Sequence, residues 1–181
     1  MTAFLKLAGD YTNWNVYKKA EIISDVTELF ILRAIEKPSR TIDQMRQAAR
    51  SCKQNIVEGI GEKTVSTEMC IKLLGVARAS ARELREDYSD FLRQNDMEIW
   101  PLNDPRTHST RQYCASHDDP ADFVAKCRQR TDETVANIML TLLKQIDSML
   151  ANTLKKFESE FIAEGGLKEA MTAARKAHRG Y

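Results

Sequence analysis

The segment RSCKQNIVEGIGEKTVSTE, residues 50–68, decides how the chain is organised. Helical spacing continues to Val57, glycines follow at Gly59 and Gly61, and Ser66 then offers a new helix start. Glycine adopts the left-handed conformation that ends helices at little cost. Serine caps a helix start by accepting a hydrogen bond from a backbone N–H. The segment therefore predicts a helix that ends at its glycines, a tight corner and a second helix.

The helices on both sides of this corner carry apolar residues at helical spacing. Residues 41–58 open with Thr41 and Gln44, which have the spacing of a capping box, in which each side chain satisfies a backbone amide. The apolar positions of this helix are Ile42, Met45, Ala49, Cys52 and Ile56. Those of the helix at 66–94 are Cys70, Leu73, Ala77, Leu84, Tyr88 and Phe91. Each row predicts one buried helix face.

Two further long helices are predicted outside this pair. The first covers residues 14–37, with Thr12 or Asn13 as its cap and a proline just beyond its end. The last covers residues 120–164 behind the cap residue Asp119, and its apolar residues recur every three or four positions. Consecutive glycines then stop this helix.

Four long amphipathic helices with mostly short connections predict an all-α, up-and-down four-helix bundle over residues 1–164. Periodicity vanishes over residues 96–118, which predicts a long irregular insert between helices three and four, either a functional loop or a mobile segment. Trp100 could anchor this insert to the body. Residues 165–181 form a C-terminal suffix, with a short fifth helix over 167–178.

The composition is that of a soluble domain. The 181 residues are 43% hydrophobic and 29% charged, with a formal net charge of +1, so any basic surface must be local. The N-terminus has no pattern typical of a signal peptide, and no apolar run reaches the roughly 18 residues of a membrane span. The four cysteines form no close pairs, and Cys52 and Cys70 fall on apolar helical positions. Reduced thiols and a cytoplasmic location are expected.

The sequence offers little for catalysis or for a metal. Glu-x-x-His, which di-iron bundles use, does not occur, and Cys114, His117 and His108 supply at most half of a zinc site within a polar loop. GIGEKT, residues 59–64, resembles a phosphate-binding loop only vaguely, because the Gly-Lys-Thr order is absent. We therefore expect no enzyme, no cofactor and no bound metal.

Rows of basic residues are the better candidate for a binding site. They are Arg46, Arg50 and Lys53 on one helix, Arg78, Arg82 and Arg85 on the next, and Lys63 in the corner between them. Each row has the spacing i, i+4, i+7, which places its members on one side of the helix, so the rows could follow a phosphate backbone. The alternative is an ordinary solvated face, since Glu83, Glu86 and Asp87 stand among these cations.

Two polar residues near the end of the first helix have their own predicted roles. Asn55 could bind free carbonyl groups or reach across to a neighbouring helix. Glu58 lies where the helix dipole is negative, so it is expected to pair with a cation, namely Arg78 or Arg82 of the antiparallel neighbour.

Residues 41–94 resemble the four-helix-bundle family of the 23S ribosomal RNA intervening-sequence proteins. The accessory variability determinant of diversity-generating retroelements belongs to the same group. The matching elements are the helix ending in NIVEG, the restart at STE and the following LLGVARASARELRED. EGGLKEAM and the basic tail are similar to the members with a suffix domain.

This resemblance implies a non-enzymatic bundle that forms a homopentamer with a central channel. In the retroelement branch it implies binding of a reverse transcriptase and RNA through basic surface. The motif positions are Asn55, Glu58 and Gly59, with Arg46, Arg50 and Lys53 on the helix before them. An oligomeric accessory factor for nucleic acid, or for an enzyme that acts on it, is therefore expected. The alternative is a protein-interaction scaffold without nucleic-acid binding, which would use the insert and the fifth helix.

Overall fold

The computed structural model describes residues 11–179, and over that range the chain is all-α, which confirms the predicted class. The long helices are α1 (Asn15–Ala34), α2 (Arg40–Glu62), α3 (Thr67–Gln94) and α6 (Asp132–Glu164). The short elements are the 3-10 turn η1 (Tyr11–Asn13), α4 (Pro105–Ser116), α5 (Pro120–Arg128) and α7 (Leu167–Arg179). Within the described residues, no helix is long and apolar enough to cross a lipid bilayer.

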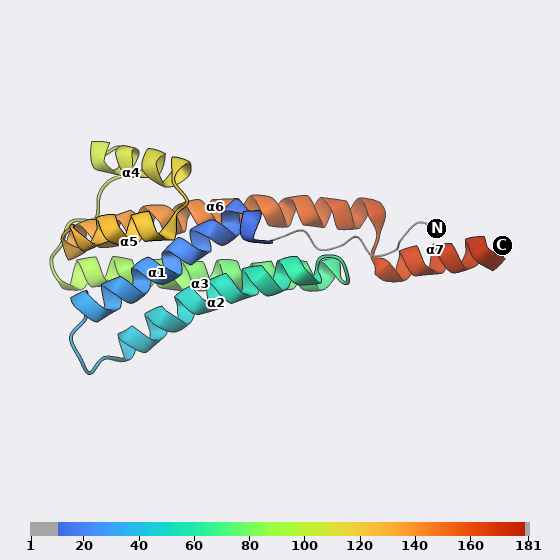
Figure 1. Ribbon diagram of the computed structural model, residues 1–181, viewed down its shortest axis with the longest axis horizontal. Coiled ribbons are helices and arrows are strands. Elements are labelled where there is room, and N and C mark those ends of the chain that lie inside the picture. Colours follow the sequence, from blue (N-terminus) through green and yellow to red (C-terminus); the bar gives the residue numbers. More distant parts are fainter. Residues whose placement is uncertain (1–10, 180–181) are drawn as a thin grey trace.

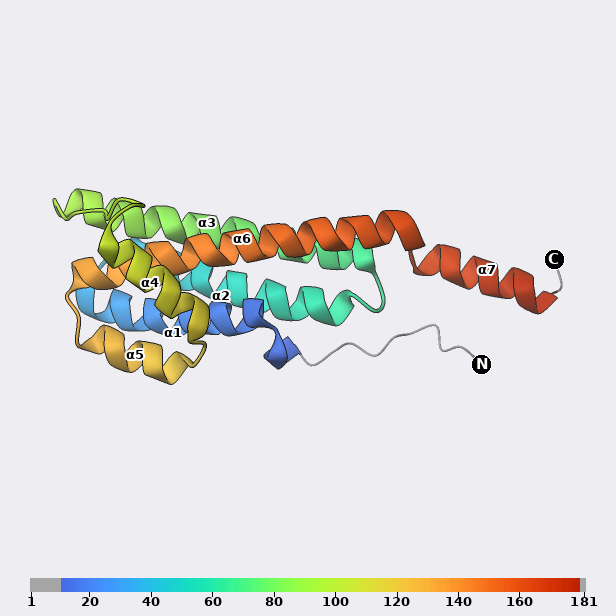
Figure 2. The same cartoon turned by 90° about the horizontal axis from the view of Figure 1, so that it is seen from above.

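The long helices lie side by side as a bundle (Figure 1). α2 packs on α3, α3 on α6, and α1 on both α2 and α6. α5 packs on α1 and α4 on α6, near one end of the bundle, whereas α7 extends past the opposite end (Figure 2). The bundle therefore has two additions at its ends, one formed by α4 and α5 and one formed by α7.

Aromatic residues fill the centre between α1 and α3. The ring of Phe30 is fully buried, with its centroid 4.8 Å from the centroids of Tyr88 and Phe91. The Tyr88 hydroxyl donates a hydrogen bond of 3.1 Å to Thr27 Oγ1, so a polar group inside the core is satisfied. Tyr88 and Thr27 thus fix the position of α3 on α1.

The corner between α2 and α3 differs from its prediction. Gly59 and Gly61 do not end the helix, because α2 continues through both of them to Glu62. A Cβ atom on Gly59 would lie only 3.3 Å from the carbonyl oxygen of Cys70, whereas one on Gly61 would meet no atom within 4 Å. Gly59 therefore allows the two helices to approach closely, which is a packing role rather than a capping role.

Helix starts agree partly with the predictions. Ser66 caps α3, with its hydroxyl accepting from Met69 N at 3.1 Å, as expected. Asp119 likewise caps α5. α2, however, begins one residue early behind the cap Ser39, so the predicted capping box does not define its start.

α1 is shorter than predicted at both ends. It runs from Asn15 to Ala34 rather than over residues 14–37. The expected cap residues lie in η1, and Trp14 takes the cap position without a side-chain hydrogen bond.

The predicted insert and last helix also need correction. The insert contains a regular helix, α4, and its start is capped by Asp104 through a 2.7 Å bond from Arg106 N. The helix predicted over 120–164 is two helices, since α5 ends at Arg128 and Thr131 caps α6. Apolar spacing continues across this break, which is why periodicity did not reveal it.

α7 is the predicted fifth helix, and it extends to Arg179. Gly165 follows α6 with a φ of 72°, a conformation that favours glycine. Glu169 then accepts a hydrogen bond from Gly166 N at 2.9 Å. The direction in which α7 leaves the bundle is therefore set between Gly165 and Glu169.

Candidate functional site

The first predicted basic row lies at the surface, and two of its members interact with carboxylates of α1. Arg46 binds both carboxylate oxygens of Glu28, at 2.9 and 3.0 Å. Lys53 interacts electrostatically with Asp25, which like Glu28 belongs to α1. Burial raises the pKa of the Asp25 carboxyl, and the positive charge of Lys53 opposes that rise. Arg50 is exposed. Arg46 is thus paired with Glu28 although its side chain is 42% exposed, and the role of the three cations in binding nucleic acid stays a prediction.

The second row is joined to α6. Arg78 and Arg82 bind the same oxygen of Asp147, at 2.8 and 2.7 Å. Burial raises the pKa of Asp147, but the two arginine hydrogen bonds outweigh it and hold the pKa below its usual value. The expected pairing of Glu58 with these arginines is therefore wrong, and Glu58 is exposed. Asp147 takes its place because α6 runs alongside α3.

The two remaining predicted cations, Lys63 and Arg85, also have acidic neighbours. The Lys63 ammonium lies 3.0 Å from Glu160 and 3.8 Å from the ring centroid of Phe157, both on α6. Arg85 lies 3.0 Å from Glu86. Lys63 thus attaches the α2–α3 corner to α6, which is a structural role.

Asn55 and Gly59 both belong to the contact between α2 and α3. Asn55 Nδ2 donates to Ser51 O at 2.9 Å, and the hydroxyl of Ser51 lies 2.9 Å from that of Ser80 on α3. Asn55 therefore binds a carbonyl inside its own helix, since α2 continues to Glu62, rather than a free carbonyl at the helix end, and it does not itself reach across. The predicted motif thus maps to helix packing, with Glu58 outside it.

A groove between the first half of α2 and the second half of α3 has a mainly acidic lining. Its volume is about 750 Å³, and its charged lining residues are Asp43, Glu83 and Asp87 with one cation, Arg40. Burial and the charges of Asp90 and Glu83 raise the pKa of Asp87, which indicates repulsion among these carboxylates. On the same side of α3 as Ser80, Glu83 and Asp87, an apolar row is exposed that consists of Met69 (44% exposed) and Val76 (48%) of α3 and of Val65 (51%) in the corner before that helix.

α7 presents the opposite charge. It extends away from the bundle with Met171 exposed on its surface (Figure 2). Arg175, Lys176 and Arg179 are exposed in its second half. The helix therefore combines an apolar side chain with a local basic surface.

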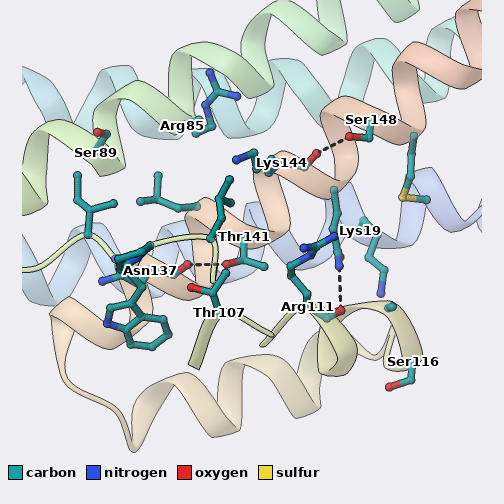
Figure 3. Close-up of a pocket in the computed structure, with 18 of the residues that line it drawn as sticks. Lys19, Arg85, Ser89, Thr107, Arg111, Ser116, Asn137, Thr141, Lys144 and Ser148 are labelled. Atoms are coloured by element: carbon teal, nitrogen blue, oxygen red, sulfur yellow. Dashed lines mark hydrogen bonds between the residues drawn. The ribbon is translucent and has the colours of Figure 1, made fainter. Parts of the chain in front are cut away.

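A second hollow of about 1100 Å³ lies beneath α4, between that helix, α6, α3 and the start of α1 (Figure 3). Four cationic side chains line this cavity, and they are Lys19, Arg85, Arg111 and Lys144. Its carboxylates are Glu86, which lies beside Arg85, and Asp118, which lies 2.7 Å from Lys18. Ile99, Leu102 and Leu140 add apolar surface. The cavity is thus both cationic and partly apolar.

The segment before α4 closes one side of this cavity. Asn137 of α6 accepts from Trp100 N at 2.8 Å and donates to Glu98 O at 2.8 Å. Trp100 is therefore held on the bundle, as its anchoring role predicts. Two residues of the lining, Trp100 and Thr107, each carry a buried polar atom, Nε1 and Oγ1, that has no hydrogen-bond partner among the described residues.

Sequence reasoning missed this cavity. Thr107 and Arg111 lie in a segment without apolar periodicity, and Lys144 looks like any exposed cation on a long helix. The one available signal was the Asp-Pro pair at 104–105, which is typical of a helix start.

The residues weighed for zinc do not converge. Cys114 is buried, and burial raises the pKa of its thiol to about 12, whereas His117 is exposed and stacks on Tyr113. Across residues 11–179, no group of three or more His, Cys, Asp or Glu side chains is placed to hold a metal ion.

Comparison of the chain with protein-family models, with curated proteins and with solved structures gave no match. The function is therefore inferred from the geometry of this chain.

Proposed function

We propose that the protein is a non-enzymatic scaffold of helical bundles, in which α7 of one copy packs on the outer face of α2 and α3 of the next. The observation that carries this assembly is the presence, on one chain, of two complementary surfaces that the described residues leave exposed. α7 exposes Met171 beyond the bundle, and α3 exposes Met69 and Val76 beside an acidic groove.

The two surfaces match in length and in charge. The 13 residues of α7 span about 20 Å at about 1.5 Å per residue, and by the same rise Met69 and Glu83 lie about 21 Å apart along α3. With Met171 against the apolar row, the basic second half of α7 would lie near Glu83 and Asp87. Such a contact would bury apolar surface and relieve the repulsion among the carboxylates of the groove.

A contact between different surfaces of identical copies joins them head to tail, and such an arrangement closes into a ring when the rotation permits. The family resemblance of residues 41–94 implies an up-and-down four-helix bundle and a ring of five copies. In that setting the ring would present several identical faces to a protein partner, for example a reverse transcriptase.

The cysteine thiols favour a non-catalytic role. They are the strongest potential nucleophiles of the chain, and all four are buried. Burial raises the pKa to about 12 for Cys52 and to about 11 for Cys127, so the thiols stay protonated near neutral pH. Since the thiolate is the reactive form, these side chains are poor nucleophiles.

Light scattering after size-exclusion chromatography tests the assembly. We expect the full chain to have a mass several times that of one copy. Met171→Glu on α7 and Val76→Glu on α3 should each reduce it toward the mass of one copy. Leu32→Glu is the matched control, because Leu32 is 54% exposed on α1 and lies outside both surfaces. A full chain that is monomeric at micromolar concentration would refute the assembly.

A charge exchange identifies the partner surface. Lys176→Glu and Glu83→Lys should each weaken assembly, and the double variant should restore it in part, because the pair is then complementary again. Equal weakening in the double variant and in the two single variants would show that α7 does not lie along the groove.

Nucleic-acid binding is the second candidate, and the exposed cations of α7 favour it over the predicted rows. Arg78 and Arg82 already share Asp147, whereas Arg175 and Lys176 are exposed beyond the bundle. The test is fluorescence anisotropy with single-stranded RNA at low and at physiological salt. Binding that weakens with salt and is lost in Arg175→Gln/Lys176→Gln, but kept in Arg78→Gln, would support this function.

A further inference from the structure

We propose that the cavity beneath α4 binds a small organic anion that carries an apolar body. This site is independent of the assembly through α7, because the cavity and α7 lie toward opposite ends of the bundle (Figures 1 and 2). Its volume of about 1100 Å³ is close to that of cavities that hold drug-sized ligands, roughly 300–1000 Å³.

The charge of the lining selects an anion. Arg111 and Lys144 have no ion-pair partner among the described residues, while the lining carboxylates Glu86 and Asp118 are each paired with a cation. Figure 3 shows Arg111 from α4 and Lys144 from α6 in the lining of the same cavity. A carboxylate, phosphate or sulfonate group between them would supply the missing counter-charge.

Lys19 adds a buried positive charge to the same wall. Its side chain is almost fully buried, at 4% exposure, and its ammonium donates to the carbonyl oxygen of His117. Burial lowers the pKa of Lys19, and the nearest carboxylate, Asp118, already binds Lys18. A bound anion would therefore stabilise a charge that the protein leaves only partly compensated.

Two residues of the lining carry donors without a partner among the described residues. Thr107 is 5% exposed, and neither its hydroxyl nor the indole N–H of Trp100 has a partner in the described chain. Buried donors are normally satisfied, so on our proposal these two donors turn toward acceptor atoms of the bound ligand. Leu140, Ile99 and Leu102 would contact the apolar part of the ligand.

Two related dyes test the site. Anilinonaphthalene sulfonate carries an anionic group on an apolar body, and phenylnaphthylamine has the same rings without the charge. We expect saturable binding of the sulfonate dye by the full chain. Arg111→Gln/Lys144→Gln should weaken that binding about tenfold or more, with little change for the neutral dye, because only the charged contact is lost. Lys155→Gln is the matched control, since Lys155 is an exposed cation of α6 outside the cavity.

Thr107→Val separates a ligand contact from a structural one. It replaces the hydroxyl with a methyl group of similar size, so a hydroxyl that only fills space would leave dye affinity unchanged. We expect several-fold weaker binding of the sulfonate dye together with a melting temperature that does not fall. No saturable binding, equal effects of the double variant on both dyes, or weakening by Lys155→Gln would each overturn the proposed site.

Discussion

Polar groups are hydrogen-bonded at the contact between α2 and α3. At the contact of α4 with the bundle, some of them are not, within the part of the chain that the structure describes. Between α2 and α3, Ser51 and Ser80 bind each other and Asn55 binds its own helix. Arg46 and Arg78, on the outer sides, have carboxylate partners. Beneath α4, Thr107 and Trp100 have donors without a partner in residues 11–179. The first contact satisfies its polar groups within the fold, whereas the second leaves donors that, on our proposal, a ligand satisfies.

The largest expected effect contrasts leucines from these two regions. Leu74 is 1% exposed at the α2–α3 contact, and Leu74→Ala should lower the free energy of unfolding by about 2–5 kcal/mol, because a cavity remains. Leu102, beside α4, is 64% exposed, and Leu102→Ala should change the free energy of unfolding by less than about 0.5 kcal/mol. Urea unfolding followed by circular dichroism measures both. Similar losses would mean that the α4 region is as tightly packed as the helix pair.

The glycines of α2 provide the next test. Gly59→Val should cost about 1–3 kcal/mol of unfolding free energy, because its Cβ would lie against the backbone of α3. Gly61→Val should change it by only about 0.5 kcal/mol, since no neighbouring atom lies within 4 Å. Thermal and urea unfolding check this contrast. If Gly61 proved the more sensitive position, the capping role predicted from the sequence would regain support.

Substitution of Asp147 should cause the smallest of these losses in unfolding free energy, and this loss should depend on pH. Asp147→Asn should cost about 1–2 kcal/mol at neutral pH, because its two arginine hydrogen bonds lose their charge. The pKa of Asp147 is lower in the folded chain than the ordinary 3.8, so its stabilisation is complete above about that pH and is lost as the pH falls through the folded value.

Urea titrations of both proteins from neutral pH into acid measure this dependence. The gap between them should shrink below about pH 4. A gap that stays constant in acid would show that the Asp147 carboxylate is not the group responsible.

What the sequence predicted correctly depends on neighbours in the chain. Ser66 and Asp119 cap helices because their side chains bind backbone amides two or three residues away, so local composition reveals them. The all-α class follows from apolar periodicity for the same reason. The break before Thr131 was missed because the apolar spacing does not change across it.

The site residues were harder to predict because their partners are distant in sequence. Arg78 and Asp147 are 69 residues apart, so the arginine row looked free when read alone. Thr107, Arg111 and Lys144 become a candidate site only after α4 packs on α6. Their significance lies in what the fold places around them, and single-sequence spacing does not record that.

The backbone conformation of Gly165 affects the geometry of any oligomer that this chain forms through α7. Its φ of 72° fixes the angle at which α7 leaves α6. If α7 joins neighbours, the rotation from one subunit to the next is transmitted through this single peptide link. Closed circles and open-ended fibres differ only in that rotation, so a bulkier residue at position 165 could turn a finite particle into a growing filament.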